Sequence, residues 1–308
     1  MARKYMYFLN EEKSKLSILG KIVPILIIIL IVLILLVYNQ IMYTQSATQA
    51  AILDSDSLGT LQNTVFVEEQ KRLQKEMEEA RKKRYNDLSR EEVDKIKHIY
   101  AHREEKTVYL TFDDGPSDNI TPVVLDILKQ YDVKATFFVL GRQAVRHPDI
   151  IKRQYNEGHT IENHTYTHSY KTVYTSKETF FDEFYRTQTA IQNSLDMEDF
   201  KTLVVRMPGG TAGGPYSKIK SQISAELYNK GIGSLDWNCL TKDAEGAETY
   251  EEVMGNVDLY TGSKTSVVLL MHDSDSKQIT AETLPKVIEY YKDRGFKFET
   301  VENYLGRN

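Results

Sequence analysis

Two hydrophobic patterns divide the chain into two regions. Residues 22–38 read IVPILIIILIVLILLVY, an unbroken apolar run, and no charged residue occurs between Lys21 and Asp54. From residue 106 onward, short apolar runs rich in β-branched and aromatic residues instead alternate with longer amphipathic segments. The pattern therefore predicts an apolar anchor near the N-terminus and a folded domain over 106–308.

The alternating region predicts a regular succession of strands and helices. The expected strands are 107–112, 134–140, 159–163, 202–207, 232–239, 266–271 and 296–300. The expected helices lie near 119–130, 142–156, 177–195, 217–230, 248–260 and 280–293. Strands that alternate with helices favour an α/β fold with a parallel sheet, either open or closed into a barrel.

The apolar block is long enough to be a transmembrane helix. Its hydrophobic stretch continues to Met42 without a polar face, and about 20 apolar residues cross the hydrocarbon core of a bilayer. We therefore expect a transmembrane anchor over 22–42. A cleaved signal peptide is the alternative, because small residues follow at Ser46 and Ala47, although such peptides have a shorter apolar core of about 7–15 residues.

Basic residues flank this block on one side only. Five lie before it, at Arg3, Lys4, Lys13, Lys15 and Lys21, and the next is Lys71. The excess of positive charge predicts a cytoplasmic segment over 1–21 and places the rest of the chain outside the cell membrane, as in a single-pass protein.

The segment 43–105 is expected to be an extracellular spacer and a charged helical stalk. Residues 67–83 are dense in charged, helix-forming residues. Ser89, followed three positions later by Glu92, is a capping-box signal for a second helix. Cys239 is the single cysteine, so no disulfide within the chain is expected, and the net charge of −5 argues against a nucleic-acid partner.

Ionisable residues lie at or just beyond the ends of five of the predicted strands. These residues are Asp113 and Asp114, His164 and His168, Arg206, Asp243, and His272. The sites of parallel α/β proteins lie at the carboxyl ends of the strands, so these side chains are expected to meet at one rim.

The residue types predict a metal site. One helical turn would aim His164 and His168 in the same direction. Two imidazoles and a carboxylate leave an open position, which is typical of catalytic zinc. Non-haem iron is the alternative reading of the same trio. An oxygenase, however, has no need of a second Asp, an Arg and a further His, whereas hydrolysis of an amide or ester uses them as base, positioning group and acid.

Four motifs carry a resemblance to a known family. They are TFDDGP at 111–116, HTYTH at 164–168, RMPGG at 206–210 and LLMH at 269–272. With these motifs in this order, residues from about 106 to 300 resemble the polysaccharide deacetylases of carbohydrate esterase family 4. The resemblance implies a distorted seven-stranded (β/α) barrel, here preceded by a transmembrane helix and a helical stalk.

The resemblance also implies roles for individual residues. Asp113 would be the base and His272 the acid, while Asp114, His164 and His168 would bind the metal. Arg206 would hold Asp113, the backbone N–H of Gly209 would stabilise the oxyanion, and Leu270 would line the acetyl pocket. An aromatic residue usually follows the proline of the third motif. Gly209 stands there in this chain, which removes a wall that faces the sugar.

The fourth motif, an Asp that orients the acid histidine, has two candidates. Asp236 is followed by Trp237, as in the family, but both fall inside the predicted fifth strand. Asp243, followed by Ala244, lies just beyond that strand, where the other site residues are expected. Position in the fold favours Asp243.

The resemblance predicts a metal-dependent deacetylase of cell-envelope glycan. We expect it to remove acetyl groups from peptidoglycan N-acetylglucosamine, with zinc as the metal and cobalt, nickel or manganese as alternatives. A wall-linked secondary polysaccharide, or an O-acetyl ester, is the alternative substrate. A surface-tethered glycan-binding protein without activity is the alternative class. No protein partner is inferred.

Overall fold

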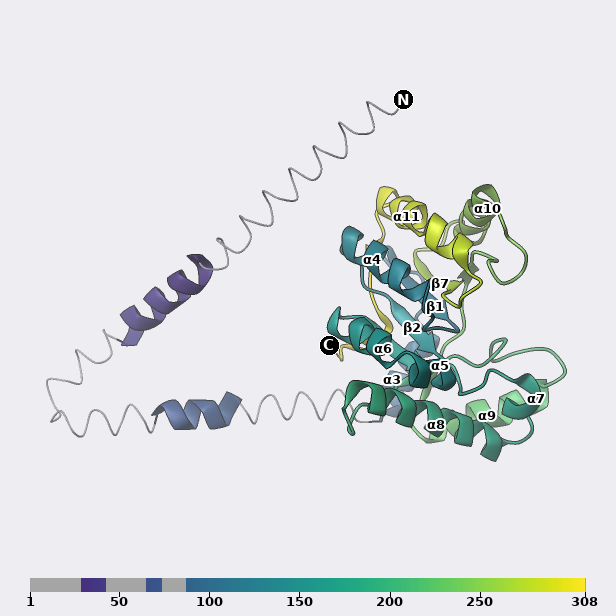
Figure 1. Cartoon of the computed structure of the whole chain (residues 1–308), viewed down its shortest axis with the longest axis horizontal. Helices are drawn as coiled ribbons and strands as arrows, with labels where there is room; N and C mark the ends of the chain where they lie inside the picture. The colour runs from purple at the N-terminus through teal and green to yellow at the C-terminus, as the bar shows by residue number, and fades with distance from the viewer. Residues whose placement is uncertain (1–28, 43–64, 74–86, 308) are drawn as a thin grey trace, which may run out of the picture. The chain divides into compact units, whose positions relative to one another are not determined.

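The computed structural model describes residues 29–42, 65–73 and 87–307 (Figure 1). The chain divides into two compact units, 1–78 and 79–308. In the first unit, residues 29–42 and 65–73 are helical. No helix of the described residues has the length and apolar character needed to cross a membrane. The expected cytoplasmic segment and part of the expected anchor, at 22–28, lie outside the described residues, as does most of the expected spacer.

The second unit is built on a parallel sheet (Figure 1). Its strands are β1 (Thr107–Asp113), β2 (Thr136–Val139), β3 (Thr160–Asn163), β4 (Val204–Val205), β5 (Gly233–Ser234), β6 (Cys239–Leu240), β7 (Ser266–His272) and β8 (Lys297–Phe298). They are ordered β5-β4-β3-β2-β1-β7-β6, and the short β8 pairs with the start of β1. The predicted α/β class with a parallel sheet is confirmed. The sheet is a curled half-barrel, because no ladder joins β5 to β6 among the described strands.

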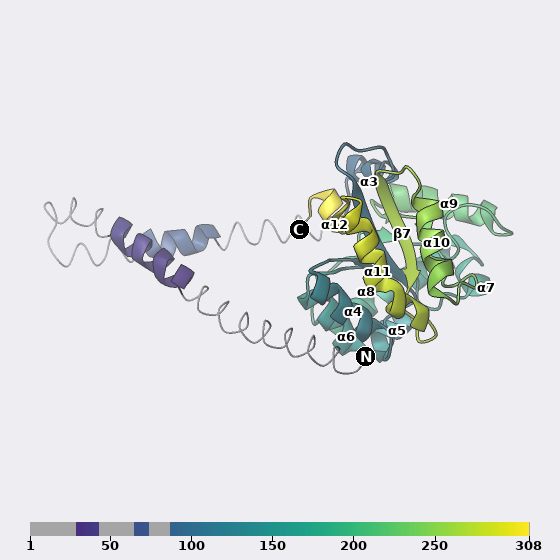
Figure 2. The same cartoon turned by 90° about the horizontal axis from the view of Figure 1, so that it is seen from above.

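Helices connect the strands and cover the sheet. They are α3 (Arg90–Lys97), α4 (Thr121–Tyr131), α5 (Gly141–Arg146), α6 (Pro148–Asn156), α7 (Tyr170–Val173), α8 (Lys177–Leu195), α9 (Ser217–Asn229), α10 (Tyr250–Thr261), α11 (Gln278–Asp293) and α12 (Val301–Leu305). The single helix expected over 142–156 is two helices, because Pro148 has no backbone N–H to continue α5 and begins α6 instead. The helices α10 and α11 pack against each other next to β7 (Figure 1 and Figure 2).

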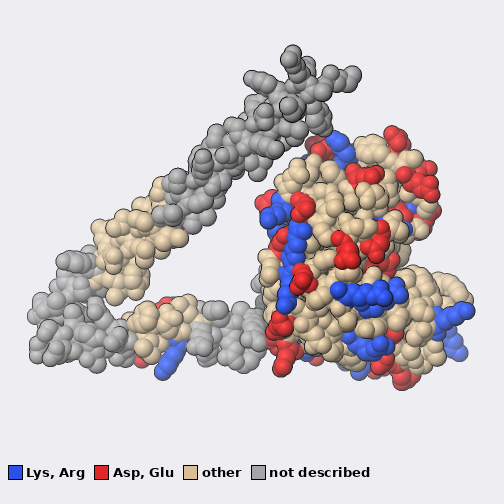
Figure 3. Space-filling view, viewed as in Figure 1, with Lys and Arg blue, Asp and Glu red and all other residues tan. Residues whose placement is uncertain are grey.

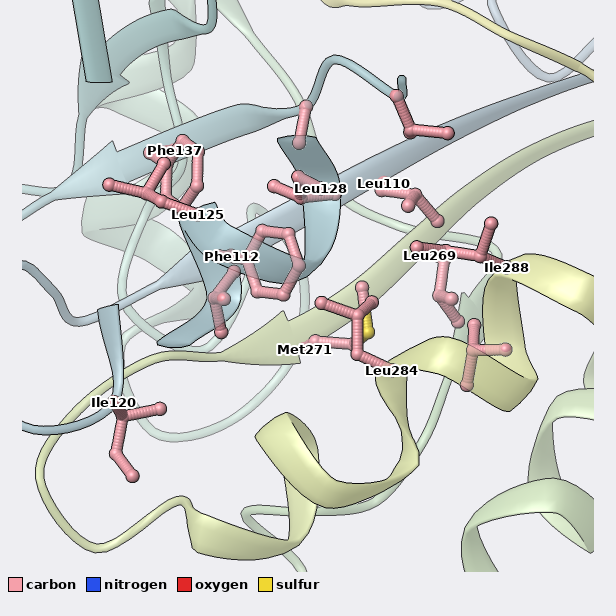
Figure 4. Packing of buried hydrophobic residues seen from close by; sticks show 14 of the residues in the cluster. Leu110, Phe112, Ile120, Leu125, Leu128, Phe137, Leu269, Met271, Leu284 and Ile288 are labelled. Carbon is pink, nitrogen blue, oxygen red and sulfur yellow. The ribbon is translucent and has the colours of Figure 1, made fainter. Parts of the chain in front are cut away.

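The main core fixes the two strands that lead to the site. Phe112 of β1 and Met271 of β7 lie in one cluster with Leu284 of α11 and Leu125 of α4, and each is at most 1% exposed (Figure 4). Full burial of such a side chain contributes about 1.5–3 kcal/mol relative to leaving it in water. The β1–β7 ladder pairs Asp113 with His272, so the ends of these strands lie side by side.

The compact unit begins before the expected boundary at residue 106. The capping box of Ser89 and Glu92 is formed as predicted. Its helix, α3, is not part of a solvated stalk, however. Val93, Ile96 and Ile99 are buried against the sheet in a second core cluster. Val93 and Ile96 give α3 one apolar face, which Ile99 continues beyond the end of the helix, and α3 contacts β5 at the edge of the sheet.

The strand expected over 232–239 is broken into β5 and β6. Between them, side chains make hydrogen bonds that a ladder would otherwise supply. The carboxylate of Asp236 accepts bonds from the N–H and hydroxyl of Thr211. The side-chain amide of Asn238 bonds the backbone of Ser266 and Val268 in β7. Asp236 therefore follows the end of β5 and does not lie inside a strand.

Candidate active site

The two adjacent carboxylates that follow β1 have different environments. Asp113 is the last residue of the strand and is 2% exposed. Asp114 has a left-handed backbone conformation, with φ of 75°, so the chain turns sharply between the two side chains. Oδ1 of Asp113 meets Arg206, and its Oδ2 lies 3.7 Å from Nε2 of His164. Oδ1 of Asp114 lies 3.7 Å from Nε2 of His164 and also 3.7 Å from Nε2 of His168.

The histidine pair lies on a loop, not on the helical turn that its spacing suggested. Residues 164–169 follow β3 without helix, and Thr165 and His168 have positive φ values of 67° and 59°. These two conformations fold the loop back so that the imidazole rings of His164 and His168 lie 4.9 Å apart. The carboxylate of Glu183 holds the loop by accepting bonds from the backbone N–H groups of Tyr166 and Thr167.

Asp114, His164 and His168 fit a divalent cation. Their ligand atoms all lie within 4.8 Å of one another. Oδ1 of Asp114 is buried and has no hydrogen-bond partner among the described residues. Nδ1 of His164 lies 2.6 Å from the carbonyl oxygen of Arg206, which fixes the ring with Nε2 toward Asp114. Burial, reinforced by His164, lowers the pKa of His168 to about 4, so its imidazole is neutral, as a ligand must be.

Arg206 connects the predicted base to the interior of the sheet. Its guanidinium is fully buried and donates to Oδ1 of Asp113 at 2.8 Å and to the hydroxyl of Thr111 at 2.7 Å. The same group donates to the carbonyl oxygens of Leu235 and Asp236. These four bonds leave the guanidinium no freedom to rotate. Because the partner is fixed, the Asp113 carboxylate is held in one orientation at the rim.

His272 and Asp243 form the second ionic pair. Nδ1 of His272 lies 2.9 Å from Oδ1 of Asp243, and the backbone N–H of His272 donates to Oδ2 at 2.7 Å. Burial disfavours a charged imidazole, but the bond and charge of Asp243, with the charges of Asp113 and Asp114, outweigh it and raise the pKa of His272 to about 9. The structure therefore places Asp243, and not Asp236, beside the predicted acid.

The other predicted residues lie at the same edge of the sheet or support it. Leu270 is two residues before His272 in β7, so its side chain is on the same face of the strand. Gly209 lies in the turn after β4, with φ of 69°. Asp236 holds the next residues of that turn through Thr211.

Sequence reasoning missed a buried carboxylate behind the site. Asp273 follows His272, and its Oδ2 accepts the hydroxyl of Thr121 at 2.7 Å. Its backbone N–H donates to the carbonyl oxygen of Asp113, and its own carbonyl oxygen accepts the hydroxyl of Ser117. Asp273 thereby joins the end of β7 to the turn that carries Asp114. The sequence signal that could have identified Asp273 is its place directly after His272. Glu183, which holds the histidine loop, had no comparable signal, because it lies far from the motifs in the sequence.

Comparison with known proteins agrees with this arrangement. A profile of the polysaccharide deacetylase family matches residues 100–228. A peptidoglycan-N-acetylglucosamine deacetylase of Bacillus cereus is 33% identical over 202 residues, which cover 64% of this chain and 70% of that protein. The chain belongs to the polysaccharide deacetylase family.

Other polysaccharide deacetylases and one solved structure extend the likeness. The peptidoglycan-N-acetylglucosamine deacetylase PgdA of Listeria monocytogenes is 30% identical over 216 residues, 69% of this chain. The match covers 41% of that longer protein, so the chain spans about two fifths of its length. The structure of a Streptococcus mutans carbohydrate esterase family 4 enzyme is 34% identical, with a TM-score of 0.59 over 68% of this chain and 90% of that one.

Proposed function

We propose that this chain is a metal-dependent hydrolase that removes N-acetyl groups from the N-acetylglucosamine of peptidoglycan. One observation carries the proposal. The cluster of Asp114, His164 and His168 is flanked by two ion pairs, Asp113 with Arg206 and His272 with Asp243. A base and an acid thus stand at the ends of neighbouring strands, paired in register, beside a site for a cation.

Each of these residues has a step to perform in amide hydrolysis. Zinc is the proposed cation, and when bound it polarises the acetyl carbonyl and lowers the pKa of water. Asp113 accepts a proton from the attacking water while Arg206 keeps the carboxylate in place. The N–H of Gly209 stabilises the negative charge that develops on the carbonyl oxygen. Protonated His272 then donates its proton to the leaving nitrogen, so that acetate and a free amine are formed.

The choice of substrate rests on the relatives and on surface charge. Proteins of Bacillus cereus and Listeria monocytogenes that are similar to this chain are named peptidoglycan-N-acetylglucosamine deacetylases. Acidic and basic side chains are interspersed on the face of the second unit shown in Figure 3. The interspersed acidic side chains leave no continuous basic surface on this face of the described residues, which argues against a nucleic acid as the substrate.

We further propose that the catalytic unit works outside the cell membrane. The apolar run over 22–42 and the basic residues before it support an anchor with a cytoplasmic N-terminus. An anchored enzyme in that orientation would meet the cell wall directly.

An acetate-release assay on the chain of residues 1–308 tests the function. Purified N-acetylated peptidoglycan is incubated with the native chain, with a chelator-treated sample, and with the Asp113→Asn variant. We expect release only by the native chain, and recovery when zinc is restored to the treated sample. Release from a wall-linked secondary polysaccharide or from an O-acetyl ester, without release from peptidoglycan, would assign the alternative substrate. Glycan binding without release from any substrate would assign the inactive binding protein.

A further inference from the structure

Tyr170 lies beside Gly209, the position at which the third motif has a glycine in place of an aromatic residue. It is the first residue of α7, two positions after His168. Its ring lies edge-on to the His168 ring, with 5.6 Å between the centroids. A Cβ atom built on Gly209 would lie 2.5 Å from the Tyr170 hydroxyl oxygen and 3.0 Å from Cε1 of the ring. The tyrosine therefore stands between a predicted metal ligand and the predicted oxyanion donor.

A side chain at position 209 would displace the Tyr170 ring from its present place. A contact of 2.5 Å to a Cβ atom is shorter than van der Waals packing permits, so Gly209 is what allows the ring to be there. The aromatic residue expected after the proline is thus replaced, in space, by one from the loop that carries the histidines. The replacement comes from a segment 39 residues earlier, which is why the motif alone did not reveal it.

The ring of Tyr170 lies near two other aromatic rings and is partly open to solvent. Tyr174 and Tyr216 are its neighbours, with ring centroids 5.9 and 6.3 Å away. Tyr174 is itself fixed, because its hydroxyl donates to the carbonyl oxygen of Pro208. Tyr170 nevertheless remains 39% exposed. A large aromatic side chain that is backed by other rings and open to solvent beside a catalytic site is preorganised for a ligand.

We infer that Tyr170 is a substrate-contacting residue that packs its exposed ring against the sugar whose acetyl group is removed. This inference rests on the proposed function and names a determinant of its specificity. A pyranose ring has an apolar C–H face that suits an aromatic side chain, while the phenol hydroxyl remains at the edge beside Gly209. Tyr170 thereby supplies the sugar-facing wall that position 209 does not.

The test compares ring removal with hydroxyl removal. The variants are Tyr170→Ala and Tyr170→Phe, and the control is Tyr250→Ala, which also changes the first residue of a helix and is 44% exposed. The probe is the soluble tetramer of N-acetylglucosamine. We expect Tyr170→Ala to raise KM by roughly three- to ten-fold, as loss of an aromatic contact would, with kcat changed less than about two-fold. Tyr170→Phe and Tyr250→Ala should retain the native KM.

Metal content and the unfolding midpoint are measured on the same samples, because Tyr170 also touches His168. Equal KM values for Tyr170→Ala and Tyr250→Ala would overturn the inference. An equal rise in KM in Tyr170→Phe would also overturn it, because the hydroxyl and not the ring would then bind the sugar. A loss of metal from Tyr170→Ala that accounts for the whole rise in KM would overturn it as well. If the native chain binds the tetramer but releases no acetate, the proposed function fails, and the same variants compared by calorimetric binding still decide the role of Tyr170.

Discussion

Replacing Asp243 with asparagine should move the pH dependence of the reaction. Asp243 is buried, and its carboxylate bonds both Nδ1 and the backbone N–H of His272, while Thr280 donates to Oδ2 at 2.7 Å. Asparagine has nearly the same shape and no charge. The change therefore removes the negative charge beside the imidazole and keeps most of the packing.

The size of the effect follows from that charge. An opposite charge about 4 Å away, at an effective dielectric constant of about 20, is worth about 4 kcal/mol, which corresponds to about three pKa units. The pKa of His272 is raised from 6.5 to about 9 against the opposing effect of burial. Without the carboxylate, burial remains, and the pKa should fall to about 6.5 or below. At about pH 8 the protonated fraction would then drop from about 90% to about 3%, roughly thirty-fold.

The assay is kcat/KM for acetate release as a function of pH. An acid must be protonated to act, so the alkaline limb of the profile should shift to lower pH in Asp243→Asn. A bound divalent cation repels the imidazolium in both proteins, so it lowers the pKa of His272 in the native chain and in the variant and preserves the difference between them. Asp236→Asn is the matched control, because its carboxylate bonds Thr211 and not His272. An alkaline limb that stays in place in Asp243→Asn, with metal content and unfolding midpoint unchanged, would refute the assignment of His272 as the acid.

Three further predictions concern the metal, the oxyanion turn and the topology. Asp114→Asn should lower zinc content, measured by elemental analysis, whereas Asp113→Asn should retain zinc and lose about 10²–10⁴-fold in turnover; the reverse pattern would exchange their roles. Gly209→Ala should impair acetate release far more than Gly214→Ala, because both glycines have φ near 70° but only position 209 lacks space for a Cβ atom. Equal losses of activity in the two variants would show that the Tyr170 side chain moves aside without cost. A protease added to intact, wall-stripped cells should digest the body and spare residues 1–21, and protection of the body would reverse the proposed orientation.

Patterns within short stretches of the sequence predicted much of the fold and of the site. The apolar runs of β1 and β7 are buried throughout most of their length, so their pattern identified them and placed Asp113 and His272 at their ends. Asp243 was preferred over Asp236 from its position after a strand, and the structure places it against His272.

Other features depend on contacts between distant segments and could not be read locally. The spacing of His164 and His168 suggested a helix, but the loop is folded by bonds to Glu183, which comes from α8. The break after β5 depends on Asp236 and Thr211, whose bond joins residues 25 positions apart. Charge density along α3 indicated a solvated helix, and its buried face became visible only against the sheet.

The contact between α3 and α12 has a consequence for the order of assembly. Arg307 bonds Glu92 at 2.7 Å, across 215 residues, and holds the pKa of that carboxyl near 2. The first and last helices of the catalytic unit therefore meet. During synthesis α3 emerges from the ribosome long before α12, so this contact can form only after α12 has also emerged. For the same reason, the two ends could be joined by a short linker and the chain reopened in a surface loop, giving a circular permutant with the same fold.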